Sequence, residues 1–266
     1  HTGRPMKIGE FERQGRRIGW RRFGHPQGQK VILFHGPSFG AGDYLNNRDA
    51  AINNKLDIIA IERPGYGRTH TPNRHQDPLR CQVDDALALV DKLELKTFSI
   101  LAHEVGLIPA LAFANRQPEQ CQGILAVSAA PPFLELEQIN AMPANQGIFI
   151  HAARHAPWLA KLLIRLLMVR MRKLGPERWI DVIFHDVKPD MQVINRSEFR
   201  AGVIGSYSFY LNQMGAGFEV DLQIMLQDWG KSFAQCTVPI RVLHGTHNPT
   251  TPPHVLDIFR QLNPNA

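Results

Sequence analysis

The chain has 266 residues, the length of one large α/β domain or two small ones, and 44% of them are hydrophobic and 20% charged. This ordinary globular composition excludes a disordered, collagen-like or coiled-coil protein. The 30 Lys and Arg residues outnumber the 24 Asp and Glu residues, which gives a formal net charge of +6. Such a mildly basic balance permits nucleic acid or another acidic ligand, but it is more typical of a solvated basic surface.

The cysteines are few and widely separated. Cys81, Cys121 and Cys236 form no CxxC pair and leave an odd number, so they do not describe a disulfide framework. A reducing compartment is the default for such a set, and we therefore expect a cytoplasmic protein. We expect it to need no cofactor and no metal ion.

The first part of the chain predicts a hairpin followed by alternating strands and helices. Residues 8–14 and 16–23 have the pattern of paired strands around a turn at Gly15. Because the strands that follow are short and almost continuously apolar, they predict a parallel sheet covered by helices on both faces. Those strands are expected at residues 30–34, 56–61, 97–102, 123–128 and 238–244, and helices at residues 76–93, 107–116 and 254–262.

The pattern changes to a helical period between residues 132 and 232, with breaks at several prolines. This change predicts a helical cap inserted into the sheet domain. The expected division is a core of residues 1–131 and 233–266 and a cap of residues 132–232.

One segment of this cap, residues 157–174, has the composition of a basic amphipathic helix. Three basic residues interrupt its longest apolar stretch, so it falls short of the roughly 18–20 apolar residues that a membrane span needs. A helix of this kind can lie on a membrane surface. Its apolar positions extend too far around the helix for that, however, and we expect it to pack on the core with its Lys and Arg side chains pointing outward. No membrane partner is therefore expected.

Three loops follow predicted parallel strands, at residues 35–40, 102–106 and 244–252, so they should meet at one edge of the sheet. Together with the turn at residues 61–69, which is similar to a D-x-P-G-x-G-x-S motif, they resemble the α/β-hydrolase fold from residue 8 to the end of the chain. The resemblance implies a mostly parallel central sheet flanked by helices, with an inserted helical cap over a largely apolar pocket.

The resemblance also shows where this chain departs from the family. Glu104 occupies the position of the serine nucleophile in the G-x-S-x-G elbow, and Ala102 replaces its first glycine. The related epoxide hydrolases and dehalogenases place a carboxylate there, although theirs is Asp, one methylene shorter. Asn248 occupies the position of the catalytic acid and cannot carry the charge that orients a protonated histidine.

The oxyanion hole and the catalytic histidine depart from the family too. By resemblance, the backbone N–H groups of Val105 and of Pro37 would form the hole, but proline has no N–H, so Ser38 or Phe39 would have to supply the second donor. No catalytic histidine was found, because in the family it follows a further strand and the chain stops at Ala266. His244, His247 and His254 lie too early to match it.

Some of these residues also have plain structural explanations. Glu104 can serve as a polar cap at the start of the next helix. His103 is expected to pack beside the elbow without a catalytic role. Tyr207 and Tyr210 fall in the cap, where epoxide hydrolases place tyrosines that polarise the epoxide oxygen, but cap tyrosines more often form core or pocket wall.

Two hypotheses for function remain. The leading one is a non-catalytic receptor or sensor module that binds a mostly apolar small molecule and can form part of a transcriptional regulator. Nucleic acid would then bind only through a fused region outside this chain, and a homo-oligomer is possible. The alternative is a hydrolase with a carboxylate nucleophile, acting on an epoxide, a halide, or a lactone or other ester. The expected ligand-binding residues are Gly36, Pro37, Ser38, Phe39, His103, Glu104, Val105, Tyr207, Tyr210, His247 and Asn248.

Overall fold

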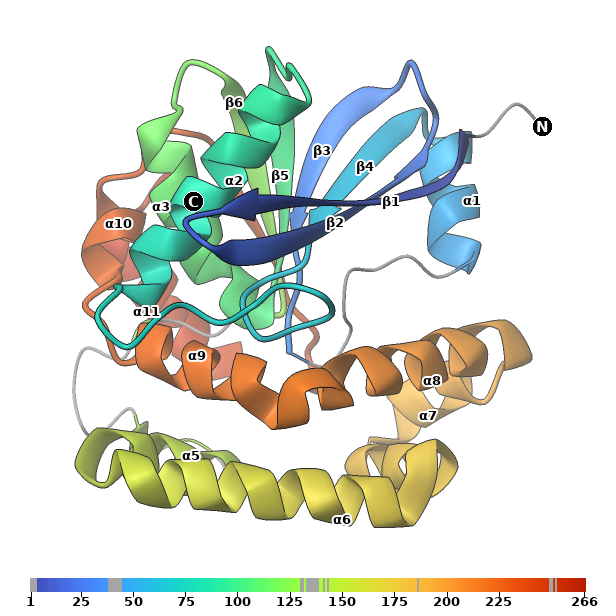
Figure 1. The fold of residues 1–266 in the computed structure, drawn as a ribbon, viewed down its shortest axis with the longest axis vertical. Coiled ribbons are helices and arrows are strands. Elements are labelled where there is room, and N and C mark those ends of the chain that lie inside the picture. The colour runs from blue at the N-terminus through green and yellow to red at the C-terminus, as the bar shows by residue number, and fades with distance from the viewer. Residues whose placement is uncertain are drawn as a thin grey trace.

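A computed structural model describes residues 4–37, 45–129, 132, 139–140, 142, 144–185, 187–248, 251 and 253–266. Within these ranges the strands form one seven-stranded sheet with the order β1-β2-β4-β3-β5-β6-β7 (Figure 1). The strands are β1 (Arg4–Arg13), β2 (Arg16–Gly24), β3 (Gln29–Phe34), β4 (Leu56–Ile61), β5 (Phe98–His103), β6 (Cys121–Val127) and β7 (Ile240–Leu243).

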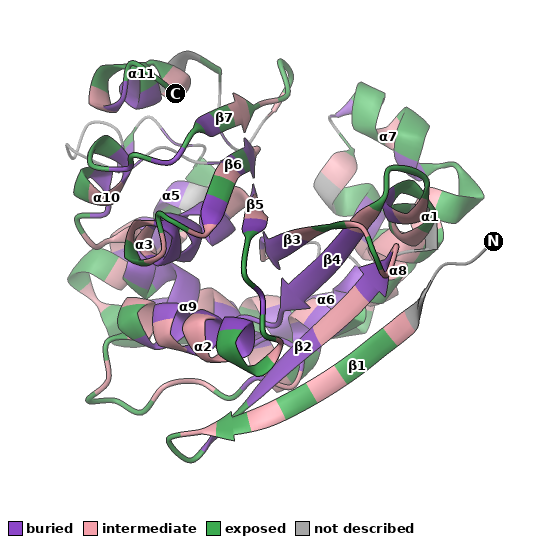
Figure 2. Ribbon diagram, turned by 90° about the horizontal axis from the view of Figure 1, so that it is seen from above, coloured by how far each residue is buried: buried purple, intermediate pink, exposed green. Residues whose placement is uncertain are grey.

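The expected hairpin and mostly parallel sheet are confirmed. The strands β1 and β2 pair antiparallel around Gln14 and Gly15, both of which have positive φ angles, as a tight hairpin turn requires. From β4 to β7 every neighbouring pair is parallel. In Figure 2 the edge strand β1 is partly exposed, whereas β3 and β4 are buried in the centre.

The register of the parallel strands aligns their carboxyl ends. Phe34 of β3 pairs with Ala102 of β5, His103 of β5 pairs with Val127 of β6, and Val127 in turn pairs with Leu243 of β7. The residues that follow these strands therefore emerge at one edge of the sheet, where open α/β sheets bind their ligands.

Alternate side chains of the central strands serve two different hydrophobic clusters. Ile32 and Phe34 belong to a cluster with buried residues of α2 and α3, whereas Val31 and Leu33 belong to one with Ala51 of α1. Because neighbouring side chains of a strand point to opposite faces, helices cover both faces of the sheet. The helices of this layer are α1 (Leu45–Asn53), α2 (Pro78–Lys92), α3 (Leu107–Arg116), α10 (Gly230–Ala234) and α11 (Asp257–Leu262).

A second group of helices lies across the carboxyl edge of the sheet, where the sequence predicts a cap (Figure 1). These helices have a hydrophobic cluster of their own, centred on Ile164, Met168 and Tyr207. The exact division at residues 131–132 and 232–233 stays a prediction, because residues 130–131 and 133–138 lie outside the described ranges. The cap helices are α5 (Ala144–His155), α6 (Pro157–Phe184), α7 (Lys188–Ile194), α8 (Ser197–Leu211) and α9 (Ala216–Met225).

The segment expected to pack on the core as one helix forms the first part of α6. Gly175, with φ 74°, and Pro176 kink this long helix. One side of the helix buries Ile164 and Met168 in the hydrophobic cluster of the cap itself, and not against the sheet domain as expected. Its opposite side leaves large apolar residues exposed. No helix in the described part of the chain combines the length and the apolar character needed to cross a membrane.

A buried ion pair joins the cap to the sheet. Arg63, two residues after β4, donates from Nη1 and Nη2 to the two carboxylate oxygens of Asp221 in α9, at 2.5 and 3.0 Å. Its Nε donates to the carbonyl of His35 at 2.6 Å, and the hydroxyl of Tyr66 donates to Asp221 at 2.7 Å. Burial disfavours the charged guanidinium, but Asp221 outweighs this effect and raises the pKa of Arg63.

The same turn approaches α9 so closely that only glycine fits. A Cβ atom on Gly65 would lie 2.3 Å from the backbone nitrogen of Gly217, and one on Gly217 would lie 2.4 Å from the ring of Tyr66. Gly65 also has a φ of +80°, which glycine adopts without strain. The glycines of this motif therefore serve the contact between cap and sheet.

Glu62, which stands where the family motif has Asp, has a structural role. Its buried carboxylate accepts hydrogen bonds from Nε of Arg21 at 2.9 Å and from the backbone N–H of Arg68 at 2.7 Å. Burial alone would raise the pKa of Glu62, but the hydrogen bonds from Arg68 and Arg21 outweigh it and lower the pKa. The charged carboxylate thus fastens the turn to β2.

Replacing Asp221 with Asn should strongly destabilise the protein, because it leaves the guanidinium of Arg63 buried without a counter-charge. Removing one partner of a buried pair typically costs about 3–5 kcal/mol, so the melting temperature should fall by roughly 10 °C. The matched control is Glu219→Gln on the same helix, since Glu219 forms a more exposed ion pair with Lys161 at 3.5 Å and should contribute less than ~1 kcal/mol. Equal melting temperatures for the two variants would contradict the role of Asp221.

Candidate functional site

Glu104 lies at a sharp turn between β5 and α3. Its φ angle is +50°, in the left-handed region that non-glycine residues rarely adopt. Two residues later, a Cβ atom on Gly106 would lie 2.3 Å from the carbonyl oxygen of Phe34, so the start of α3 is pressed against β3. A strained residue between a parallel strand and a helix is the geometry of a nucleophile elbow.

The carboxylate of Glu104 does not cap the following helix. Neither the short 3-10 helix Glu104–Gly106 nor α3 has a side-chain hydrogen bond at its start. Within the described residues, Oε2 of Glu104 is buried and has no hydrogen-bond partner. A buried carboxylate oxygen without a donor is unfavourable, so Glu104 lacks the hydrogen bonds that would stabilise its charge at this atom.

His103 and Gly36 surround this carboxylate. Nδ1 of His103 lies 3.9 Å from Oε2 of Glu104, longer than a direct hydrogen bond, and both side chains remain about a quarter exposed. A Cβ atom on Gly36 would lie 2.5 Å from Oε2 and 2.6 Å from Nδ1. Because residue 36 has no side chain, the carboxylate of Glu104 and the ring of His103 can occupy the space next to it.

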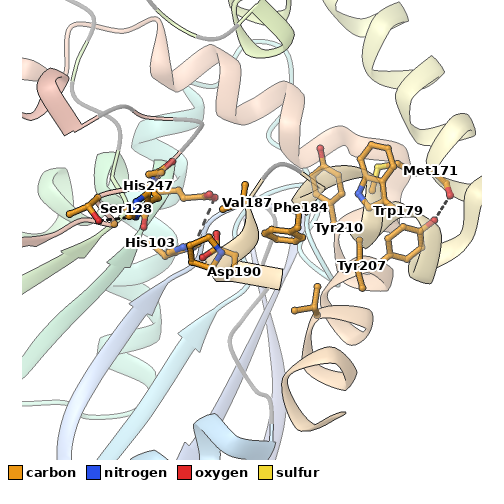
Figure 3. A pocket seen from close by; sticks show the side chains of 17 residues that line it. His103, Ser128, Met171, Trp179, Phe184, Val187, Asp190, Tyr207, Tyr210 and His247 are labelled. Carbon is orange, nitrogen blue, oxygen red and sulfur yellow. Dashed lines mark hydrogen bonds and ion pairs between the residues drawn. The ribbon is translucent and has the colours of Figure 1, made fainter. Parts of the chain in front are cut away.

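A cavity of about 480 Å³ opens above Glu104, between the sheet edge and the cap. Its polar end gathers residues from three strand ends, and its other end is built from α6, α7 and α8 (Figure 3). In Figure 3, His103, Ser128 and His247 lie together at one end, whereas Trp179 and Tyr207 lie at the other. The cap contributes Met171, Trp179, Ile180, Phe184, Val187, Pro189, Asp190, Val203, Tyr207 and Tyr210.

The two cap tyrosines of the cavity have different roles. The hydroxyl of Tyr207 donates to the backbone carbonyl of Met171, so it is already engaged within the cap. Tyr210 stacks near Tyr66, with ring centroids 6.3 Å apart. Burial raises the pKa of Tyr210, and the negative charges of Asp221 and Glu104 raise it further, so its phenol stays protonated at neutral pH.

The loop after β7 places His247 and Asn248 among the residues that line the cavity. The side-chain oxygen of Asn248 accepts a hydrogen bond from the backbone N–H of Thr251 at 3.0 Å, which shapes the loop itself. Nδ1 of His247 lies 3.1 Å from the hydroxyl of Thr246, and Nε2 of His244 lies 2.7 Å from the carbonyl of Thr251. Asn248 therefore uses its acceptor to hold the loop.

The loop after β3 supports the site from below. Nε2 of His35 accepts the backbone N–H of Arg63 at 2.9 Å, and its Nδ1 lies 2.7 Å from the carbonyl of Gly36. Burial and the charge of Arg63 lower the pKa of His35 well below its usual value, so it is neutral. Gly36, Pro37 and Val105 are not among the residues that line this cavity, so their expected ligand-binding role stays a prediction.

Two expected site residues, Ser38 and Phe39, lie outside the described residues. Ser128 and Asp190 also line the cavity beside the predicted groups, although neither was predicted as a site residue. Ser128 follows β6 with a φ of +53°, and the rule that strand ends gather at one edge would have identified it. Asp190 comes from α7, and no sequence motif marks it. Among the described residues, no group of three or more His, Cys, Asp or Glu side chains is arranged to hold a metal ion.

Comparison with known proteins identifies the family of the chain. Residues 25–263 match the hydrolase family described as serine aminopeptidase, S33. A 133-residue segment is 29% identical to a protein named probable lysophospholipase BODYGUARD 2 from Arabidopsis thaliana, and it covers 48% of this chain and 27% of that protein. The chain spans less than half the length of the first two curated relatives that it matches.

Solved structures of low sequence identity share the fold. The enol-lactonase from Burkholderia xenovorans LB400 superposes with a TM-score of 0.68 at 14% identity, covering 97% of this chain and 89% of that one. The epoxide hydrolase CorEH superposes with a TM-score of 0.66 at 17% identity, covering 98% and 88%. The predicted α/β-hydrolase fold is thereby confirmed, and the chain belongs to the serine aminopeptidase S33 family of the α/β-hydrolase superfamily.

Proposed function

We propose that this protein is a hydrolase in which the carboxylate of Glu104 is the nucleophile and an apolar epoxide is the substrate. The observation that carries the proposal is the carboxylate of Glu104, which stands on a strained elbow, lines the cavity and has one oxygen, Oε2, without a hydrogen-bond partner among the described residues. The matches to hydrolases favour this alternative over the receptor hypothesis, and none of them supports a sensor role.

A carboxylate nucleophile favours a substrate with an electrophilic saturated carbon. Attack on an ester carbonyl would give an acid anhydride, which is more reactive than the ester that was cleaved. Attack of Glu104 on an epoxide carbon instead forms an ordinary ester, and it breaks the strained C–O bond of the ring. The electron pair of that bond moves to the ring oxygen, which must then receive a proton.

Tyr210 is the group that we assign to supply this proton. It faces the same cavity from the cap, and its pKa is raised by burial and by nearby carboxylates, Glu104 among them. A protonated phenol can polarise the epoxide oxygen and donate to it as the ring opens. Because the hydroxyl of Tyr207 is held by Met171, Tyr207 is left to form the cavity wall.

The second step releases the product by hydrolysis of the glutamyl ester. His103 lies close enough to Glu104 to take a proton from a water molecule, whose oxygen then attacks the carboxyl carbon of residue 104. The backbone N–H of Val105 would stabilise the resulting oxyanion, whereas Pro37 has no N–H to offer. The ester C–O bond breaks as the proton held by His103 passes to the departing oxygen, which leaves Glu104 as a carboxylic acid. Glu104 then loses this proton to solvent and the phenolate of Tyr210 takes one from solvent, so both groups return to their starting states. The net reaction adds water to an epoxide and gives a vicinal diol.

Trapping of the glutamyl ester tests the nucleophile. With styrene oxide as the probe, the His103→Gln variant should form the ester but hydrolyse it slowly, so intact mass spectrometry should show one added epoxide. Peptide mapping should place the added mass on Glu104, and Glu104→Gln should gain none. Unchanged turnover in Glu104→Gln would refute the proposal, and saturable binding of the epoxide to the wild type without any reaction would favour the receptor hypothesis.

Comparison of two phenylalanine variants tests the acid. Removal of a general acid typically costs on the order of 100-fold or more in rate, so Tyr210→Phe should lower kcat for styrene oxide by about that factor. Tyr207→Phe is the matched control on the same helix, and it should retain a kcat within about threefold of the wild type. Equal losses in the two variants would assign both tyrosines to packing.

Gly36→Ala and Gly106→Ala should have different effects, the first on the reaction rate and the second on the stability of the fold. The new Cβ at residue 36 meets the ends of two side chains, so it should displace Glu104 and His103 and lower the rate of ester formation roughly 100-fold with little change in melting temperature. The new Cβ at residue 106 meets the backbone of β3 and should lower the melting temperature markedly. Thermal melts and single-turnover kinetics of both variants measure the difference. An unchanged rate of ester formation in Gly36→Ala would contradict the role of the Glu104 carboxylate as the nucleophile.

A further inference from the structure

The outer side of α6 carries a continuous stripe of exposed apolar side chains. Trp158, Leu162, Leu166 and Val169 are 71, 46, 57 and 43% exposed, and their spacing of four, four and three residues places them on one face of the helix. The opposite face is packed into the cap, where Ile164 is fully buried. The helix is therefore apolar on both sides but has a packing partner on only one.

Basic side chains lie beside this stripe, and the segment that carries them has no acidic residue of its own; Lys161 pairs with Glu219 of α9 at 3.5 Å. Between Ala144 and Pro176 the sequence contains no Asp or Glu, and all of its Lys and Arg residues are exposed. The six basic residues of this segment carry as much positive charge as the net +6 of the whole chain, and α5 and α6 in full, with Glu177, Arg178 and Asp181 included, carry a net charge of +5. The basic residues are Arg154, Lys161, Arg165, Arg170, Arg172 and Lys173.

The stripe lies on the outside of the molecule, away from the candidate active site. In Figure 1, α5 and α6 form the layer farthest from the sheet, with α8 and α9 between them and the strands. The residues of α6 that line the cavity, among them Met171 and Trp179, are different from those of the stripe. The face therefore needs an explanation separate from catalysis.

We propose that this outer face of α6 docks on the surface of an anionic lipid bilayer. Exposed Trp and Leu side chains can enter the boundary between headgroups and acyl chains, while the flanking Lys and Arg side chains contact anionic headgroups. At a rise of 1.5 Å per residue, the stripe from Trp158 to Val169 is about 17 Å long, so it can lie flat in that boundary. A second copy of the chain is a poor occupant, because a symmetric contact would bring the two basic layers together.

The proposal does not depend on the chemistry of Glu104, so it is tested by binding alone. Co-sedimentation of the wild type should be substantial with phosphatidylcholine vesicles containing phosphatidylglycerol and weak with phosphatidylcholine alone. Binding should weaken as salt rises, because part of it is electrostatic. The emission of Trp158 should shift to the blue on binding, and Trp158→Phe should abolish that shift. Absence of binding to the anionic vesicles would overturn the proposal.

Two double variants, each with its own control, separate the apolar and the electrostatic contributions to vesicle binding. Leu162→Ser/Leu166→Ser should lower the partition coefficient at least tenfold, while Ile8→Ser, at a residue 52% exposed on β1, should leave it unchanged. Thermal melts of each variant check that the fold is intact.

The charge pair is Arg165→Glu/Arg170→Glu, which should also lower binding to anionic vesicles at least tenfold. Its control is Lys92→Glu/Lys96→Glu, which changes the net charge equally at exposed residues outside the cap and should have a much smaller effect. An equal loss of vesicle binding in both double variants would show that only net charge matters, and it would overturn the proposal that the outer face of α6 binds. Binding to short duplex DNA that depends on the arginine pair but not on the leucine pair, without vesicle binding, would assign the face to nucleic acid instead.

Discussion

The buried ion pair between Arg63 and Asp221 is the interaction on which the arrangement of the site depends. It fixes α9 to the turn after β4, and its guanidinium also holds the carbonyl of His35. Tyr66 donates to the same carboxylate and stacks near Tyr210 of the cavity wall. One buried contact thus connects the cap, the loop after β3 and Tyr210, the proposed acid. It therefore helps to set how far the cap lies from Glu104.

The sheet and its functional edge follow from local features of the sequence. The strands of the central sheet are short apolar runs ended by glycine, proline or polar residues, and the rule for parallel strands places residues 35–37, 103–106 and 244–248 together. The elbow was recognisable because its residues occur in a fixed order between a strand and a helix. Even the departure at Glu104 was visible, since the side chain at a strained turn is defined by its position.

The rest depends on contacts between residues far apart in the chain. Nothing local in the cap sequence pairs Asp221 with Arg63, which precedes it by 158 residues. The difference between Tyr207 and Tyr210 likewise arises from which backbone carbonyl and which carboxylates lie nearby in space. The two-sided apolar character of α6 was plain in the sequence, but periodicity alone cannot say which side a neighbour covers.

The left-handed backbone at residue 104 has a consequence for redesign. It goes together with the close packing of α3 against β3 at Gly106, two residues away, where a Cβ atom would lie 2.3 Å from the carbonyl oxygen of Phe34. The backbone of the turn should therefore direct whichever side chain occupies residue 104 toward the same cavity. A single substitution at residue 104 should therefore place a different nucleophile or binding group at the cavity. Substitutions in the cap residues that line the cavity would then alter ligand selectivity separately.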